Sequence, residues 1–125
     1  MQYDEFIASV AEKAGLPRDE AEALTHATLR VLSERISGGE AEDLREQLPK
    51  PLRADLIPPQ EEARGFGAEE FARRVAQRTG IDEADAGAAV MAVLATLRNA
   101  VSPGEFQDVL SQLGREFAEL LESTS

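Results

Sequence analysis

Apolar residues recur at helical spacing from the start of the chain. Phe6 and Val10 are four positions apart and share one stripe of a helix predicted over residues 3–14. Gly15 follows directly, where the end of a helix favours a residue with positive φ. A second helix is predicted over residues 18–36. Its core stripe consists of Ala21, Thr25, Thr28, Leu29, Leu32 and Ile36. No stretch shows the alternation of a strand, so the pattern predicts an all-α fold.

The same pattern returns 65 positions further along the chain. A shift of 65 aligns residues 3–56 with residues 68–121 without a gap, and 17 of these 54 positions are identical. The identical positions include apolar residues at helical spacing and the glycine after the first helix: Phe6 and Phe71, Val10 and Val75, Gly15 and Gly80, Leu29 and Leu94, Leu48 and Leu113. This agreement predicts an internal duplication, whose second copy has helices over 68–79 and 83–101. Asp82 is the predicted N-cap of the latter helix.

The duplication predicts the domain organisation. Residues 1–56 form helical repeat one, residues 57–67 ("IPPQEEARGFG") form a linker, and residues 68–125 form helical repeat two. A single copy of about 55 residues is marginally stable by itself. We therefore expect one compact unit, in which two tandem three-helix repeats pack as a pseudo-twofold six-helix bundle. Two independent small bundles are the alternative.

The third helix of each copy begins with a repeated phrase, "SGGEAEDL" in copy one and "SPGEFQDV" in copy two. Ser37 and Ser102 are predicted to be N-caps, because serine oxygen accepts a backbone N–H of the first turn. Glu40 and Glu105 stand three residues later, at the spacing of a capping box. These four residues are therefore predicted structural helix caps.

Beyond this start the two copies differ. Pro49 and Pro51 interrupt copy one, because proline removes a helical hydrogen bond and restricts the residue before it. We expect a helix to about Leu48, followed by a short turn of helix through Leu56. Residues 103–122 of copy two contain no such interruption and are expected to form one unbroken helix.

The helix predicted over residues 83–101 is unusually apolar. It carries no charge from Ala86 to Leu97, which predicts burial on all sides. Small residues recur along it at every fourth position: Ala84, Ala88, Ala92 and Thr96. Small side chains allow two helices to cross closely, so we expect it beside the second helix of copy one, near the pseudo-twofold axis. The alternative is a homodimer in which a second chain buries this helix.

Composition and charge narrow the classes of partner. The chain has 24 acidic and 13 basic residues and a formal net charge of −11, which repels nucleic-acid phosphates. It has no cysteine, which excludes disulfides and thiolate chemistry. No apolar run approaches the roughly 20 residues of a membrane helix, and the start "MQYDEF" lacks the features of a signal peptide. We expect an acidic cytoplasmic protein with neither a nucleic-acid nor a membrane partner.

Residues that carry chemistry do not form a recognisable constellation. His26 is the single histidine, lies on the polar side of its helix and is predicted to be a surface residue. Neither a second histidine nor a cysteine is present to complete a transition-metal site, and the aspartate-rich loop of a calcium site is missing. Hydroxyl side chains are scattered, with no base placed beside them. We predict no enzymatic activity, cofactor or metal site; an enzyme using carboxylates or a hard metal ranks last among the hypotheses.

The functional hypotheses are based on the apolar helix predicted over residues 83–101. Ala88, Met91, Ala92 and Ala95 are its candidate interface or ligand-facing residues. The leading hypothesis is a non-enzymatic protein-interaction or scaffold module that binds a protein partner or associates with itself. The alternative is a carrier or sensor that binds a small apolar ligand between the repeats.

Four segments resemble a known family. They are "YDEFIASVAEKAGL", "LSERISGGEAEDLREQLP", "EEFARRVAQRTGI" and "LRNAVSPGEFQDVLSQL". Together they resemble the bacterial domain of unknown function DUF2267 over nearly the whole chain, and the "SGGE" to "QLP" segment is the most specific. Gly114 departs from the proline expected by analogy with Pro49, which implies a straighter last helix. The resemblance implies a small helical bacterial protein with no assigned activity, so no functional residues are transferred.

Overall fold

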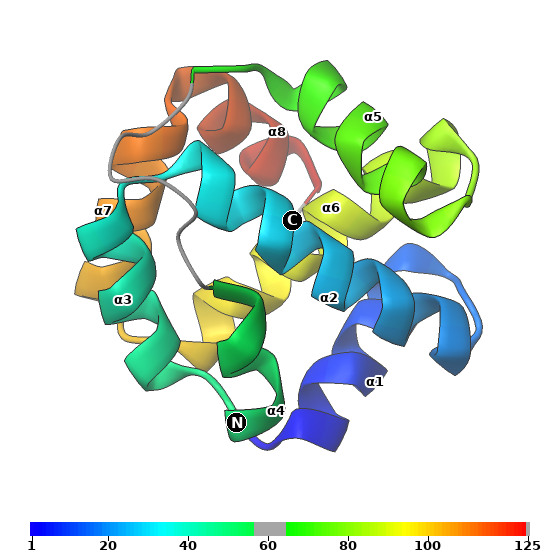
Figure 1. Cartoon of the computed structure of the whole chain (residues 1–125), viewed down its shortest axis with the longest axis horizontal. Helices are drawn as coiled ribbons and strands as arrows, with labels where there is room; N and C mark the ends of the chain where they lie inside the picture. The colour runs from blue at the N-terminus through cyan, green and yellow to red at the C-terminus, as the bar shows by residue number, and fades with distance from the viewer. Residues whose placement is uncertain (57–64, 125) are drawn as a thin grey trace.

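The computed structural model describes residues 1–56 and 65–124, and within these residues every regular element is helical. The fold is therefore all-α (Figure 1). The elements in chain order are α1 (Tyr3–Ala14), α2 (Arg18–Arg35), α3 (Gly38–Gln47), α4 (Lys50–Arg53), the 3₁₀ helix η1 (Ala54–Leu56), α5 (Ala68–Thr79), α6 (Glu83–Ala100), α7 (Pro103–Leu113) and α8 (Arg115–Thr124). Most of the predicted linker, residues 57–64, lies outside the described part of the chain.

The residues that were predicted to begin or end helices do so in the structure. Gly15 ends α1 with a φ of 68°, and Gly80 ends α5 with a φ of 74°. Both angles are left-handed, which glycine adopts without a steric penalty. Asp82 precedes α6, and its Oδ1 accepts the N–H of Ala84 at 2.7 Å. The bounds of the first two helices in each half consequently agree with the predicted ranges to within one residue.

The prediction of one unbroken helix over residues 103–122 is wrong. α7 ends at Leu113, the following Gly114 has a φ of 96° and a ψ of −179°, and α8 begins at Arg115. The absence of proline suggested a straight helix, but glycine alone permits this left-handed turn. The turn directs α8 back onto the core, where Phe117 and Leu121 are buried and the Phe117 ring meets Phe71 edge-on at 5.7 Å.

Gly114→Ala is expected to lower the free energy of unfolding by about 1 kcal/mol or more, because alanine is strained at this positive φ. A Cβ at this position would have no neighbouring atom within 4 Å, so the cost comes from the backbone and not from a clash. Urea denaturation followed by circular dichroism measures the change. Gly104→Ala is the matched control, since it also meets open space but without positive φ. Equal stability of the two variants would contradict the prediction.

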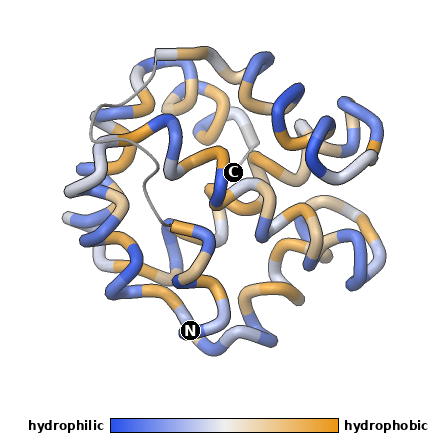
Figure 2. Tube along the Cα trace, viewed as in Figure 1, coloured by the Kyte–Doolittle hydropathy of each residue, from blue (hydrophilic) through white to orange (hydrophobic). Residues whose placement is uncertain are grey.

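The hydrophobic core is continuous across both halves of the chain. α2 packs against α6, while α1 also contacts α6 and α5 also contacts α2. Figures 1 and 2 show α2 and α6 crossing the middle of the molecule, with apolar positions spaced along the helices around them. Each half therefore buries apolar surface of the other.

The repeated serine phrase joins the halves through hydrogen bonds. Ser37 Oγ accepts the N–H of Glu40 at 3.3 Å, and Ser102 Oγ accepts that of Glu105 at 3.2 Å. The backbone N–H of each serine, which a capping box would direct to the glutamate, is donated to a glutamine of the opposite half instead. Gln112 Oε1 accepts from Ser37 at 2.6 Å, and Gln47 Oε1 accepts from Ser102 at 2.7 Å.

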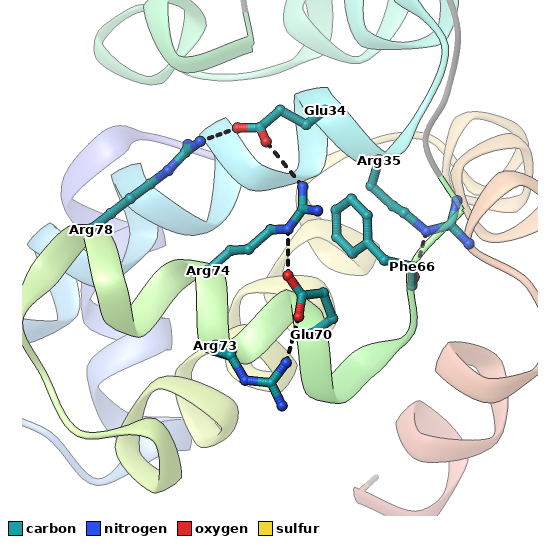
Figure 3. Close-up of polar contacts among 7 residues, drawn as sticks. All are labelled: Glu34, Arg35, Phe66, Glu70, Arg73, Arg74 and Arg78. Atoms are coloured by element: carbon teal, nitrogen blue, oxygen red, sulfur yellow. Dashed lines mark hydrogen bonds and ion pairs between the residues drawn. The ribbon is translucent and has the colours of Figure 1, made fainter.

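Arg35, at the end of α2, connects three further segments. Its guanidinium donates to the carbonyl oxygens of Phe66, Gln112 and Leu113 at 2.7–2.8 Å. The Phe66 ring lies between Arg35 and Arg74, and the Arg74 Cζ is 4.0 Å from the ring centroid (Figure 3). Burial lowers the pKa of Arg35. This side chain thereby holds the start of α5 and the end of α7 against α2.

An ion-pair network on the same side connects α2 with α5. Glu34 of α2 pairs with Arg78 and with Arg74, the latter at 3.4 Å. Glu70 of α5 accepts from Arg74 at 2.8 Å and from Arg73 at 2.5 Å (Figure 3). The two contacts of Glu34 cross from one half of the chain to the other, whereas those of Glu70 lie within α5. All are on a partly exposed surface, so each adds little stability singly.

Candidate functional site

The four candidate interface residues on α6 separate into buried and open positions. Ala92 is 4 % exposed and belongs to the core. Ala88 is exposed, while Met91 and Ala95 are half-buried. The prediction that this helix is buried on all sides is therefore wrong. Alanine exposes little apolar area, so a charge-free helix face does not require a covering element.

The open side of α6 borders an apolar groove of about 450 Å³. α5, α6 and α8 all contribute to it. Its apolar lining includes Ala72, Gly87, Val90, Met91 and Leu120. Leu120 is 37 % exposed and contributes a large apolar side chain to the groove. The side chains of Glu69 and Glu83 complete the lining and are exposed. All of these residues belong to the second half of the chain, so this apolar groove does not lie between the halves.

A second hollow, of about 740 Å³, lies between the halves. α2, η1 and α5 form it. Its polar lining includes His26, Arg30, Asp55, Arg78 and Thr79. Two guanidinium groups and a carboxylate make this hollow unsuited to an apolar ligand.

His26 belongs to a hydrogen-bonded network at one wall of this hollow. Its Nδ1 pairs with Asp55, and its Nε2 lies 3.0 Å from the Tyr3 hydroxyl, which donates to Glu22. Arg30 Nε donates to the second Asp55 oxygen at 2.9 Å. The Asp55 side chain is only 3 % exposed, and His26 is half-buried. The predicted surface histidine is thus part of a cluster that helical periodicity did not reveal, because its partners come from α1 and η1.

This network resembles a general-base arrangement, in which a buried carboxylate orients a histidine. Both ring nitrogens of His26 are occupied, however. Burial and the hydrogen bond to Glu22 raise the pKa of Tyr3 to about 12, so the phenol holds its proton firmly. An activated nucleophile needs the opposite shift. The network is therefore suited to holding α1 and η1 against α2.

A pair of buried carboxylates lies where α3 meets α7. Glu40 and Glu105 are 65 positions apart, and each is 9 % exposed. Burial, followed by the hydrogen bond and charge of Glu105, raises the pKa of Glu40 to about 8. Glu40 Oε1 and Glu105 Oε2 are buried without a hydrogen-bond partner among the described residues. The sequence suggested that each glutamate caps its own helix; the side chains meet because the helices pack together.

Two comparisons with known proteins bear on identity. The model of a family described as uncharacterized conserved protein (DUF2267) matches residues 3–120. A search of curated proteins gave no match. Within the described residues, no helix has the length and apolar character needed to cross a membrane. Because the family model covers nearly the entire chain, the protein belongs to the DUF2267 family.

Proposed function

We propose that this chain is a non-enzymatic protein-interaction module. Its groove between α5, α6 and α8 receives an amphipathic helix of a partner protein, with lysines or arginines beside the apolar face of that helix. The observation that carries the proposal is the open apolar groove with acidic residues in its lining.

The floor of the groove suits a helix. Gly87 and Ala72 are small, and a Cβ added at Gly87 would lie 3.8 Å from the Ala72 Cβ, so α5 and α6 approach closely here. Small side chains let the backbone of a docked helix come near, and Met91 and Leu120 supply larger apolar contacts. Methionine adapts its shape to different partners.

Charge selects the kind of helix. Glu69 and Glu83 line the groove, Asp82 and Asp85 are exposed beside Glu83, and the chain has a net charge of −11. Arg73 offsets Glu69 in part, at 3.2 Å. A basic helix gains electrostatic attraction at such a surface, whereas a second copy of the same face would bring acids against acids. A partner of different sequence is consequently favoured over self-association.

We also propose that the halves are repeats related by a pseudo-twofold axis that passes between α3 and α7. Three observations support this arrangement. Gln47 accepts from Ser102, and Gln112, its counterpart 65 positions later, accepts from Ser37. Glu40 meets its own counterpart Glu105. α1 contacts α6 just as α5 contacts α2. The groove on α6 then has no apolar equivalent on α2, where Glu22 replaces Gly87 and His26 replaces Met91.

The test uses a fluorescent peptide designed as a basic amphipathic helix with an alanine and leucine face, and measures binding by fluorescence anisotropy. Gly87→Leu fills the groove without a change of charge, and Glu83→Lys reverses the charge of one lining residue. Each variant is expected to weaken binding at least about tenfold, which corresponds to about 1.4 kcal/mol. Glu12→Lys, an equal change of charge on exposed residue 12 of α1, is the matched control and should have a small effect.

Amide chemical shifts locate the contact. The peptide should perturb residues of α5, α6 and α8 around Gly87 and Leu120. Perturbation confined to other surfaces, or equal affinity of Gly87→Leu and the unmodified protein, would contradict the proposal. If the peptide does not bind but a small apolar dye binds in the groove, the ligand-carrier function is favoured instead. A mass that rises with protein concentration would favour self-association.

A further inference from the structure

The carboxylate pair between α3 and α7 has the properties of a cation site. Glu40 and Glu105 are each about nine-tenths buried, and each has one oxygen with no hydrogen-bond partner in the described ranges. Asp108, one turn after Glu105, is exposed and brings a third carboxylate to the same point. One oxygen from each of the three residues lies within 4.8 Å of the others.

Two facing buried carboxylates need a positive charge between them. Like charges at this separation and depth oppose joint ionisation. Glu40 interacts electrostatically with Glu105, Asp108 and Asp43, all of them acidic, so negative charge is in surplus around the pair. A proton shared by the pair is one way to compensate, and a bound metal cation is the other.

The spacing allows one hard divalent cation to contact all three residues. Ca²⁺ binds oxygens at about 2.3–2.6 Å, so two ligands of one ion are at most about 5.2 Å apart. The three oxygens lie within 4.8 Å of one another, inside this limit. Ca²⁺ accepts irregular coordination, whereas Mg²⁺ demands a near-ideal octahedron, so Ca²⁺ is the better match for carboxylates that two packed helices bring together. Asp108 faces solvent, which provides a route of entry and room for water ligands. The net charge of −11 further attracts cations.

We propose that Glu40, Glu105 and Asp108 bind one divalent cation, with Ca²⁺ preferred over Mg²⁺. The ion lies where the third helices of the two halves meet, and connects α3 to α7 through a carboxylate from each. This site is separate from the groove and does not depend on the proposed partner.

Ca²⁺ is added to chelator-treated protein at a fixed pH of about 7.5, where most carboxylates are ionised. Isothermal titration calorimetry should report one site per chain. The thermal midpoint should rise by about 5–10 °C once Ca²⁺ exceeds its Kd about a hundredfold. Mg²⁺ at equal concentration should give a smaller rise. Broadening of amide signals around positions 40, 105 and 108 by Mn²⁺ locates the ion.

Glu105→Gln should abolish the Ca²⁺-dependent rise. This variant is expected to fold, because it removes a buried charge and retains the shape of the side chain. Asp108→Asn should weaken binding at least about tenfold. Glu42→Gln is the matched control: it removes an exposed carboxylate of α3 that is not one of the three ligands, and binding should remain within about threefold. No midpoint shift in the unmodified protein, or an equal shift in Glu105→Gln, would overturn the site and leave the shared proton as the compensating charge.

Discussion

Arg35→Ala is expected to lower the free energy of unfolding by about 3–4 kcal/mol, because it removes a charged donor that serves three backbone carbonyls. Two of these carbonyls, of Gln112 and Leu113, lie in the last turn of α7, where no intrahelical donor is available. The substitution also removes the cation from beside the rings of Phe66 and Phe117. Urea denaturation followed by circular dichroism measures the loss.

Two variants separate the contacts of Arg35 from its charge. Arg35→Lys retains the positive charge, but one ammonium group cannot reproduce the planar set of donors, so an intermediate loss is expected. Arg98→Ala removes an exposed arginine near the Phe106 ring, at 5.9 Å, and should change stability by less than about 0.5 kcal/mol. If Arg35→Ala costs no more than Arg98→Ala, the role assigned to Arg35 is wrong.

The alignment of the two halves of the sequence could not have identified Arg35. Its counterpart 65 positions later is Ala100, so the alignment offers no matching contact. The carbonyl equivalent to that of Leu113 belongs to Leu48, and Arg53 of the same half donates to it at 3.0 Å. The two halves thus satisfy equivalent helix ends with donors from different places. Such choices depend on the tertiary arrangement and leave no periodic signal.

Features determined within a few residues were predictable from the sequence. Gly15 and Gly80 end helices by their own conformational freedom, and Asp82 starts one by its own side chain, so the helix bounds follow from local chemistry. The break at Gly114 was missed because a glycine does not end a helix by itself. Here the turn at Gly114 is favoured because it allows Phe117 to be buried in the core, and that packing depends on the tertiary structure.

The candidate sites were less predictable, because each is assembled from distant segments. The apolar character of α6 was evident, but which side stays open depends on where α5 and α8 pack. The spacing of Glu40 and Glu105 from their serines was fully explained by a capping box. Only the packing of α3 on α7 brings the two carboxylates together. His26 gave no signal, since its partners Tyr3 and Asp55 lie on other elements.

Asp55→Ala is expected to lower the free energy of unfolding by about 3 kcal/mol, the usual result of removing one partner from a buried ion pair. The Asp55 side chain is 3 % exposed, and its two oxygens are bound by His26 and by Arg30. Loss of the carboxylate leaves the Nδ1 of His26 without its partner and opens space beneath η1. The Arg30 side chain is 63 % exposed, so water can solvate its guanidinium after the carboxylate is removed. Loss of the Arg30 contact therefore contributes little to the loss of stability.

Burial is the variable that this experiment isolates. Asp4→Ala is the matched control, because Asp4 also pairs with an arginine, Arg18, at 2.7 Å, but its side chain is 83 % exposed. The control should change stability by less than about 1 kcal/mol, since exposed ion pairs contribute little. Asp55→Asn retains the shape and one acceptor oxygen, so its loss should be intermediate. Equal stability of Asp55→Ala and Asp4→Ala in urea denaturation would show that the network around His26 does not hold η1 and α1 against α2.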